Sequence, residues 1–302
     1  MLSSRLRDKI VIGTWPLSGD YGHVDPRIIQ ETLEFCYAND LKEFDTAPSY
    51  GNGFIEHFLG KVFVKKTDIL INTKIGNLPF LGKNFSIPNM RSSLEQSLKR
   101  LSIDAVNILF LHNPRDEIKD FGNVLDFMDS LKKEGKIKYK GISLAKNHNY
   151  DIDFLNSFDV VQDDGNLLDM RFLTLKLSNS TRFMARSLLA SGILSGQLNQ
   201  KSAFPDDDHR SGWLHGNRLN SICKRVAKIT DTFDIDLIDL SKIFVLSNTS
   251  VSKAIFGVKN SMHVESILNT TEESKFNHNI EMDLIKLYSN DFGLVGEKHL
   301  SV

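Results

Sequence analysis

An acid and a phenol lie five residues apart in a glycine-rich stretch near the start of this chain. Asp45 ends an apolar run that predicts a strand, and Tyr50 lies in the loop that follows it. The reference pKa of a phenol is about 10, so a tyrosine transfers a proton at neutral pH only where its surroundings are unusual. The neighbouring acid indicates that a cation is held beside the phenol.

A lysine and a histidine end the next two apolar runs, Lys74 after 69–73 and His112 after 106–111. An ammonium beside the Tyr50 hydroxyl is expected to favour phenolate and lower its pKa. Asp45 would compensate the buried charge of Lys74 and orient it. Tyr50 could then give a proton to a developing alkoxide, while His112, as a neutral donor, positions the carbonyl oxygen. The four residue types together predict general-acid chemistry on a carbonyl group.

Each of these residues also has an ordinary structural interpretation. Asp45 could cap a turn, Tyr50 could pack in it, Lys74 could be a surface cation, and His112 could be a core histidine. Their arrival at the ends of three successive predicted strands favours a shared site, because strand ends of a parallel barrel converge.

Short apolar runs alternate with longer amphipathic stretches along the whole chain, which predicts eight strand–helix units. Such alternation implies a parallel sheet, and eight units imply closure into a (β/α)8 TIM barrel. The competing doubly wound sheet lacks its usual G-x-G-x-x-G directly after the first strand. We therefore expect a single α/β domain over residues 1–302, with a C-terminal helical extension. The predicted strands are Ile10–Trp15, Leu41–Asp45, Asp68–Thr73, Val106–Leu111, Lys138–Ile142, Val160–Gln162, Phe183–Ala185 and Ala254–Phe256, and the predicted helices include Pro26–Ala38, Asp151–Ser157 and Met170–Leu177.

Composition narrows the partners. The formal net charge is −1, with 37 basic and 38 acidic residues, and no basic stripe is interleaved with aromatics, so a nucleic acid is not expected. No apolar run approaches the length of a membrane span, and the first nine residues do not form a signal peptide. Cys36 and Cys223 lack metal-ligand spacing and are expected to be reduced thiols. A cytoplasmic protein, monomeric or a small homo-oligomer, is expected.

The stretch Phe44–Gly60 resembles the signature of the aldo-keto reductase superfamily, F-D-T-A-x-x-Y-G-x-G-x-x-E-x-x-L-G. Weaker motifs follow in the family's order, and the resemblance runs from about Ile10 to Leu268. It implies a catalytic tetrad of Asp45, Tyr50, Lys74 and His112. It also implies reversible reduction of an aldehyde or ketone with hydride from NADPH, without a metal.

The resemblance implies cofactor contacts as well. Ser143 and Gln162 match contacts to the nicotinamide carboxamide, although Leu144 replaces the usual Asn. Arg186 stands where the family often has a Tyr that stacks on the nicotinamide, and a guanidinium can also lie flat on a ring. A cation at Lys259 favours NADPH, with NAD as an alternative because Ile267 replaces another Asn. The implied pyrophosphate loop and 2′-phosphate segment contain Arg186, Ser187, Leu189, Ser191, Gly192, Leu194, Gly196, Gly257, Lys259 and His263.

Three further features have two interpretations each. Asp163 and Asp164 either solvate a loop or, at the mouth, disfavour anionic substrates and suit a hydroxyl-rich one such as a sugar. Residues 206–210, Asp-Asp-Asp-His-Arg, form either a metal cluster or a polar, cofactor-covering loop, and the latter is favoured. Trp15 is expected to line the substrate pocket beside Tyr50 and His112, with core packing as the alternative. Trp213, Tyr21, Phe80 and Phe85 are additional pocket candidates.

The leading functional hypothesis is therefore an NADPH-dependent carbonyl reductase acting on a small molecule such as an aldose, a keto-sugar or an aldehyde. A second hypothesis is a barrel that binds NADP(H) as a regulatory subunit with negligible turnover. A third is a sugar-modifying enzyme that uses bound nicotinamide for internal redox, as an epimerase or dehydratase does. The intact set of four residues argues against the second hypothesis, whereas the altered position 186 leaves it open.

Overall fold

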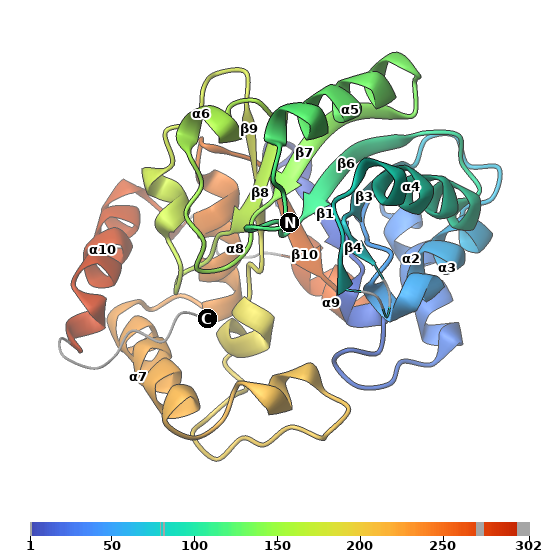
Figure 1. Ribbon diagram of the computed structural model, residues 1–302. Coiled ribbons are helices and arrows are strands. Elements are labelled where there is room, and N and C mark those ends of the chain that lie inside the picture. Colours follow the sequence, from blue (N-terminus) through green and yellow to red (C-terminus); the bar gives the residue numbers. More distant parts are fainter. Residues whose placement is uncertain (1, 79, 81, 270–274, 295–302) are drawn as a thin grey trace.

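The computed structural model describes residues 2–78, 80, 82–269 and 275–294, and shows eight parallel strands closed into a barrel (Figure 1). Their order around the barrel is β1-β10-β9-β8-β7-β6-β3-β2. This confirms the predicted (β/α)8 architecture. The strands are β1 (Ile10–Gly13), β2 (Glu43–Asp45), β3 (Leu70–Ile75), β6 (Val106–His112), β7 (Ile137–Ser143), β8 (Val160–Asp164), β9 (Arg182–Arg186) and β10 (Val251–Gly257).

Helices cover the outside of the barrel, as Figure 1 shows. The C-terminal α10 agrees with the predicted helical extension, while residues 1 and 295–302 of the predicted domain lie outside the described residues. Within the described part, no helix combines the length and apolar character needed to cross a bilayer. The helices are α1 (Ser4–Arg7), α2 (Pro26–Ala38), α3 (Phe54–Val62), α4 (Ile87–Leu101), α5 (Phe121–Lys133), α6 (Ile152–Leu155), α7 (Gly216–Thr232), α8 (Leu237–Ser247), α9 (Ser261–Leu268) and α10 (His278–Ser289).

Two separate apolar layers hold the barrel together. A large core lies between strands and helices, and a smaller cluster fills the barrel interior. Because side chains alternate along a strand, the residues that follow the interior cluster at a spacing of two also face the axis. The barrel interior is therefore apolar at the level of this cluster and polar at the carboxyl ends of the strands. The interior cluster consists of Val11, Ile108, Phe110, Val160, Met184 and Ile255.

Local chemistry explains why α2 and α3 begin where they do. Asp25 accepts a hydrogen bond from the backbone N–H of Arg27 at 2.8 Å, and Pro26 occupies the first helical position, where its missing N–H costs nothing. Gly53 precedes α3 with a φ of 85°, a left-handed conformation that favours glycine. These caps fix where the loops after β1 and β2 end.

Several predicted elements have other bounds in the structure; the second strand, for example, begins at Glu43 and not at Leu41. The predicted helix Met170–Leu177 is only a 3-10 turn, Arg171–Thr174, because Asp169 accepts bonds from the backbone N–H and side chain of Arg171 and closes a local turn. The helix at Asp151–Ser157 is reduced to α6. The first strand ends at Gly13, because Pro16 has no N–H to continue a ladder and Trp15–Leu17 form a 3-10 turn. A short hairpin of β4 (Asn77–Leu78) and β5 (Gly82–Lys83) was not predicted.

Gly60 on α3 provides a test of the helix packing. A Cβ at this position would lie 2.4 Å from the Arg100 carbonyl oxygen and 2.7 Å from the Leu101 carbonyl carbon. Gly60→Ala should therefore lower the free energy of unfolding by about 1–3 kcal/mol in urea titrations, although alanine favours helix. Gly122→Ala on α5 is the control, since a Cβ there meets only the Asp120 carboxylate at 3.3 Å. Equal effects of the two substitutions would contradict the close approach of α3 and α4.

Candidate active site

Lys74 and Tyr50 touch at the carboxyl end of the barrel. The Lys74 ammonium donates to Asp45 Oδ1 at 2.5 Å, to the Thr46 carbonyl at 2.9 Å and to the Tyr50 hydroxyl oxygen at 3.1 Å. Lys74 and Asp45 are 2% and 3% exposed. The acid, cation and phenol therefore form one group, as the sequence predicted, in which Asp45 and Lys74 are buried and Tyr50 is partly buried.

Strand register brings these side chains together. Asp45 pairs with Asn72 across β2 and β3, and Lys74 pairs with Phe110 across β3 and β6, so Lys74 and His112 each lie two residues farther along their strand. Tyr50 reaches the site from a tight turn in which its N–H donates to the Ala47 carbonyl at 3.0 Å.

His112 lies on the far side of Tyr50, with the two rings edge-on and their centroids 6.3 Å apart. The imidazole is 7% exposed, and its Nδ1 has no hydrogen-bond partner among the described residues. Burial, with the nearby charges of Lys74 and Arg186, lowers the pKa of His112 well below its usual value. His112 is therefore neutral at pH 7, as expected.

The expected direction of the Tyr50 pKa is not what the structure gives. Burial raises the pKa of Tyr50 above its ordinary value, and the opposing effect of Lys74 is smaller. For Lys74, burial acts to lower the pKa, but Asp45 and Tyr50 outweigh it and the pKa is raised. Tyr50 thus keeps its proton and Lys74 its charge at neutral pH, a state suited to proton donation.

A second polar network adjoins the first. Gln162 Nε2 donates to Asp45 Oδ2 at 2.9 Å, and Ser143 Oγ donates to Gln162 Oε1 at 2.8 Å. Arg186 Nη1 donates to Ser143 Oγ at 2.5 Å. The residues expected near a nicotinamide carboxamide are therefore joined directly to the carboxylate of Asp45.

Arg186 is held by acids. Its Nε lies 2.8 Å from Asp164 Oδ1 and its Nη2 donates to the Leu144 carbonyl at 2.8 Å. Burial acts to raise the pKa of Asp164, but Arg186 and Lys146 outweigh it and bring the pKa to about 2. Asp163 is mainly affected by burial, which raises its pKa.

Both interpretations of Asp163 and Asp164 need correction. The two residues belong to β8 and are 9% and 2% exposed, so they do not solvate a loop. Asp164 is paired with Arg186 and with Lys146, which lies 3.3 Å away, so it does not present a free negative charge at the mouth.

The segment expected to bind pyrophosphate has an irregular backbone after β9. Positive φ values recur there, which turn successive N–H groups toward a common side, the geometry of anion-binding nests. A Cβ on Gly192 would lie 3.3 Å from Arg210 Nη1, so a cation borders the segment. The φ values are 57° at Ser187, 46° at Ala190, 57° at Ser191, 88° at Gly192 and 73° at Gly196. Leu189 and Leu194 complete this turn through the bond from the Leu194 N–H to the Leu189 carbonyl at 3.1 Å.

The predicted 2′-phosphate residues lie next to this segment, after β10. Lys259 donates from Nζ to the Tyr21 carbonyl, and its backbone N–H donates to His263 Nδ1 at 3.4 Å. Gly257 pairs with Gly13 across β10 and β1, so neither strand end places a side chain there.

Aromatic rings line the other side of the mouth. Trp15 stacks with Tyr50 at 6.1 Å between centroids and lies 5.0 Å from both Tyr21 and His209. Trp213 joins the group through its 5.9 Å approach to His209. Trp15 therefore lies against Tyr50, and Tyr21 lies against Trp15. Phe85 instead is buried beneath Gly76, and Phe80 is exposed.

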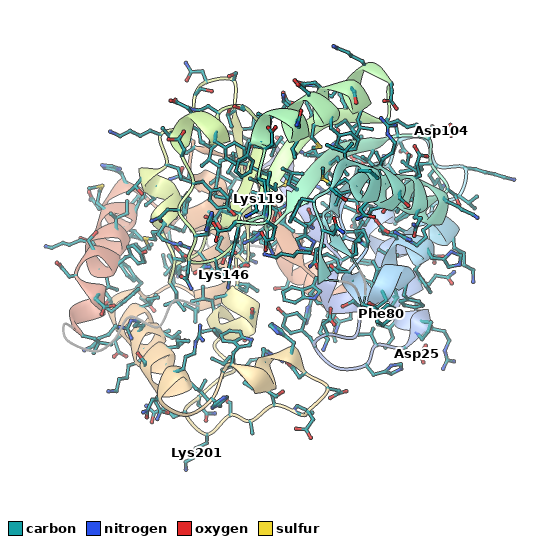
Figure 2. The ribbon with its side chains drawn as sticks, in the orientation of Figure 1. Asp25, Phe80, Asp104, Lys119, Lys146 and Lys201 are labelled. Carbon is teal, nitrogen blue, oxygen red and sulfur yellow. The ribbon has the colours of Figure 1, made fainter. Side chains whose placement is uncertain are left out.

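The polar loop closes over the mouth. Asp208 pairs with Arg210 at 2.6 Å, the backbone N–H of His209 donates to the Asp20 carbonyl at 2.7 Å, and Arg210 Nη1 donates to the Ser191 carbonyl at 3.2 Å. Among the described residues no cluster of His, Cys, Asp and Glu has metal-binding geometry. The loop is thus joined to the segments after β1 and β9, and its role in covering a cofactor stays a prediction. Lys201, which precedes this loop in the sequence, points outward at the edge of the molecule (Figure 2).

Sequence reasoning missed Lys146 and the carbonyl of Thr46 as parts of the site. Lys146 lies in a loop without periodicity, and a backbone carbonyl has no signal in the sequence.

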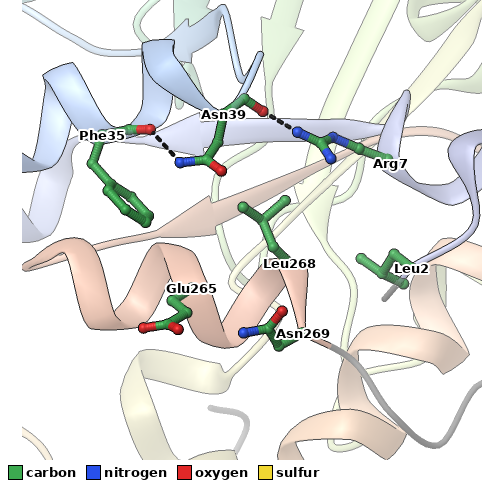
Figure 3. Close-up of a pocket in the computed structure, with 7 residues that line it drawn as sticks. All are labelled: Leu2, Arg7, Phe35, Asn39, Glu265, Leu268 and Asn269. Carbon is green, nitrogen blue, oxygen red and sulfur yellow. Dashed lines mark hydrogen bonds between the residues drawn. The ribbon is translucent and has the colours of Figure 1, made fainter.

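A cavity of about 180 Å³ lies at the opposite, amino end of the barrel (Figure 3). It is bordered by the last turn of α2 and the end of α9, where Arg7 donates to the Asn39 carbonyl. None of the predicted site residues lines it.

The family model for the Aldo/keto reductase family matches residues 9–281. The chain belongs to this family. Its sequence is 24% identical to the aldo-keto reductase YhdN of Bacillus subtilis strain 168, over 87% of this chain and 85% of the relative. It is 24% identical to the Arabidopsis thaliana protein named "Probable voltage-gated potassium channel subunit beta", over 86% of each chain. It is 26% identical to the L-galactose dehydrogenase of Arabidopsis thaliana, over 84% of this chain and 81% of the relative.

Among solved structures, the fold is similar to that of a glycerol dehydrogenase from Gluconobacter oxydans. The TM-score is 0.76 at 19% identity, and the match covers 94% of this chain and 92% of that one. The chain thus has the barrel of the Aldo/keto reductase family, whose members are in general oxidoreductases of the carbonyl/alcohol type with a nicotinamide cofactor.

The Asp164 carboxylate makes folding sensitive to acid. Its pKa falls from an ordinary 3.8 to about 2 on folding, so the unfolded chain binds the proton first and stability drops as pH falls below about 4. Between pH 5 and pH 3 this group should cost the wild type about 1 kcal/mol, a loss that urea unfolding of Asp164→Asn should lack.

Asp163→Asn is the matched control, because the Asp163 pKa is raised on folding and its contribution has the opposite sign. Removal of Asp163 should make the free energy of unfolding fall more steeply as the pH is lowered. The same acid dependence in both variants would show that Arg186 does not favour Asp164.

Proposed function

We propose that the protein reduces an aldehyde or ketone to an alcohol with NAD(P)H, and that Tyr50 is the proton donor. The observation that carries the proposal is the 3.1 Å contact between the Lys74 ammonium and the Tyr50 oxygen in a buried site. An ammonium has donors only, so the Tyr50 oxygen accepts from Lys74 and its own O–H is free to donate elsewhere.

The four side chains divide the work. Tyr50 holds its proton at neutral pH and donates it as negative charge develops on the substrate oxygen. Lys74 stabilises the phenolate that remains, and Asp45 holds Lys74 in place. Neutral His112 donates a hydrogen bond to the same substrate oxygen. The nicotinamide cofactor, when bound, supplies the hydride.

The residues of the chain suit such a cofactor. The left-handed turns at Ser191 and Gly192 offer backbone N–H groups to a pyrophosphate, and Arg210 and Lys259 bring positive charge to the same region. Lys259 and His263 favour NADPH, with NADH as the alternative. In this proposal Ser143, Gln162 and Arg186 face the nicotinamide.

The substrate we propose is a small carbonyl compound, with sugars and keto-sugars as leading candidates. The faces of Trp15 and Tyr21 beside Tyr50 suit the C–H surface of a sugar ring, and one relative is named for the sugar L-galactose. Asp164 does not support this choice, because Arg186 and Lys146 compensate its negative charge.

A regulatory subunit remains the second candidate, because one relative is named as a potassium-channel subunit. Consumption of reduced nicotinamide with an aldehyde and sugar panel distinguishes the two: a reductase consumes it, a subunit binds it without turnover. An enzyme of internal redox would convert a sugar with no net change in nicotinamide absorbance. The cytoplasmic location and the monomer or small homo-oligomer remain predictions.

Tyr50→Phe tests the acid directly. Because only the proton donor is lost, kcat should fall roughly 10²- to 10⁴-fold while the dissociation constant for NADPH stays within about twofold. Stopped-flow absorbance and fluorescence titration give the two values. Tyr37→Phe, which removes a hydroxyl bonded to Asp68 on the outside of the barrel, is the control. Turnover retained in Tyr50→Phe would refute the assignment.

Lys259→Ala tests the preferred nucleotide. Loss of a cation beside the 2′-phosphate should weaken NADPH binding roughly tenfold while NADH binding changes little. Lys253→Ala, on β10 and paired with Glu43 at 2.8 Å, should affect neither nucleotide. Equal losses for NADPH and NADH in the Lys259 variant would remove Lys259 from the 2′-phosphate site.

A further inference from the structure

The polar groups at the barrel mouth form one continuous hydrogen-bond chain across five strands. It runs from Arg186 on β9 through Ser143 on β7 and Gln162 on β8 to Asp45 on β2, and then through Lys74 on β3 to Tyr50. Apart from the Lys74–Tyr50 contact of 3.1 Å, every distance is between 2.5 and 2.9 Å.

The chemistry of the end groups allows only one assignment of donors and acceptors along this hydrogen-bond chain. Asp45 is a carboxylate that only accepts, so the amide nitrogen of Gln162 must face it and the amide oxygen must face Ser143. Ser143 has one hydroxyl proton and donates it to that oxygen at 2.8 Å, rather than to Asn113 at 3.4 Å.

The Ser143 oxygen is then left with lone pairs only. A serine, water or tyrosine there could donate or accept, but a guanidinium only donates. Arg186 therefore matches the one requirement that remains, and it cannot rotate away. Asp164 accepts from its Nε and the Leu144 carbonyl from its Nη2, both at 2.8 Å.

We propose that Arg186, fixed by Asp164, is a positioning residue that locks the order of this chain and so keeps the Lys74 ammonium aimed at the Tyr50 oxygen. This inference rests on the proposed role of Tyr50 as the acid. It assigns to position 186 a task beyond contact with the cofactor, and it explains why a buried acid follows Gln162 at a spacing of two.

A double-mutant cycle tests the link, with Arg186→Met, Ser143→Ala and the double variant measured at saturating NADPH. If Arg186 acts through Ser143, Arg186→Met should lower kcat when Ser143 is present but hardly change kcat in Ser143→Ala. The two effects on kcat should differ by roughly 3- to 30-fold. The loss of Arg186 as a partner of Asp164 is common to both backgrounds, so its cost cancels. Multiplicative effects of the two substitutions would overturn the proposal.

Two further variants separate geometry from folding. Arg186→Lys keeps the charge but cannot bond Asp164, Ser143 and the Leu144 carbonyl together, so it should show much of the same loss, and wild-type kcat would overturn the proposal. Arg171→Met is the matched control, since it removes an Arg–Asp pair of 2.6 Å outside the chain and should leave kcat unchanged.

A readout without cofactor keeps this inference separate from the proposed function. In lysine-labelled protein, the NMR signal of the Lys74 ammonium, identified by its loss in Lys74→Met, should exchange faster with water in Arg186→Met and in Ser143→Ala. The double variant should match Ser143→Ala. An unaltered signal in Arg186→Met refutes the chain even if no carbonyl substrate is found. If Tyr50→Phe retains activity but the Lys74 signal changes in the three variants as described, the role of Tyr50 as the acid is refuted and the hydrogen-bond chain is supported.

Discussion

The burial of one ammonium group constrains the whole carboxyl end of this barrel. An ion removed from water loses several kcal/mol of hydration, and Lys74 recovers it only through partners of good geometry. Asp45 and the Thr46 carbonyl supply two of them within 2.9 Å, and the Tyr50 oxygen supplies the third. Asp45 is in turn satisfied on its second oxygen by Gln162. A buried polar network of this kind is stable only when every member is satisfied, so the acid, cation and amide depend on one another.

The closed sheet makes such a network attainable from distant parts of the chain. Register staggers between β2, β3 and β6: Asp45 is level with Asn72 and Lys74 with Phe110, so Lys74 and His112 each lie two residues farther along their strand. His112, Ser143 and Gln162 share one level, and Asp164 is level with Arg186. The polar side chains thus form a layer that is tilted relative to the barrel axis and lies on the carboxyl side of the interior cluster. Backbone pairing of the strands, rather than the side-chain hydrogen bonds, fixes which residues belong to this layer.

The barrel and the meeting of Asp45, Tyr50, Lys74 and His112 at its carboxyl end were predictable, because apolar runs, their order and the residues that end them are local properties of the sequence. The direction of the Tyr50 pKa was not, because it depends on burial, which competes with Lys74 and has no sequence signal. Asp163 and Asp164 were misjudged for a related reason: β8 continues two residues beyond its apolar part, and strand alternation turns Asp164 toward Arg186. The predicted helix at Met170–Leu177 failed because Asp169 satisfies the backbone of Arg171 locally, which helical periodicity cannot reveal.

Charge balance at the mouth also bears on why the proposed acid is a phenol. Burial, Lys74 and Arg186 together keep His112 neutral, so the imidazole has no second proton to release. Lys74 is held in its charged form by Asp45 and Tyr50, and Asp164 is held ionised mainly by Arg186 and Lys146. Tyr50 alone keeps a transferable proton with a compensating cation already in contact. The cation that lets Tyr50 become a phenolate therefore also adds to the effect of burial that keeps His112 neutral.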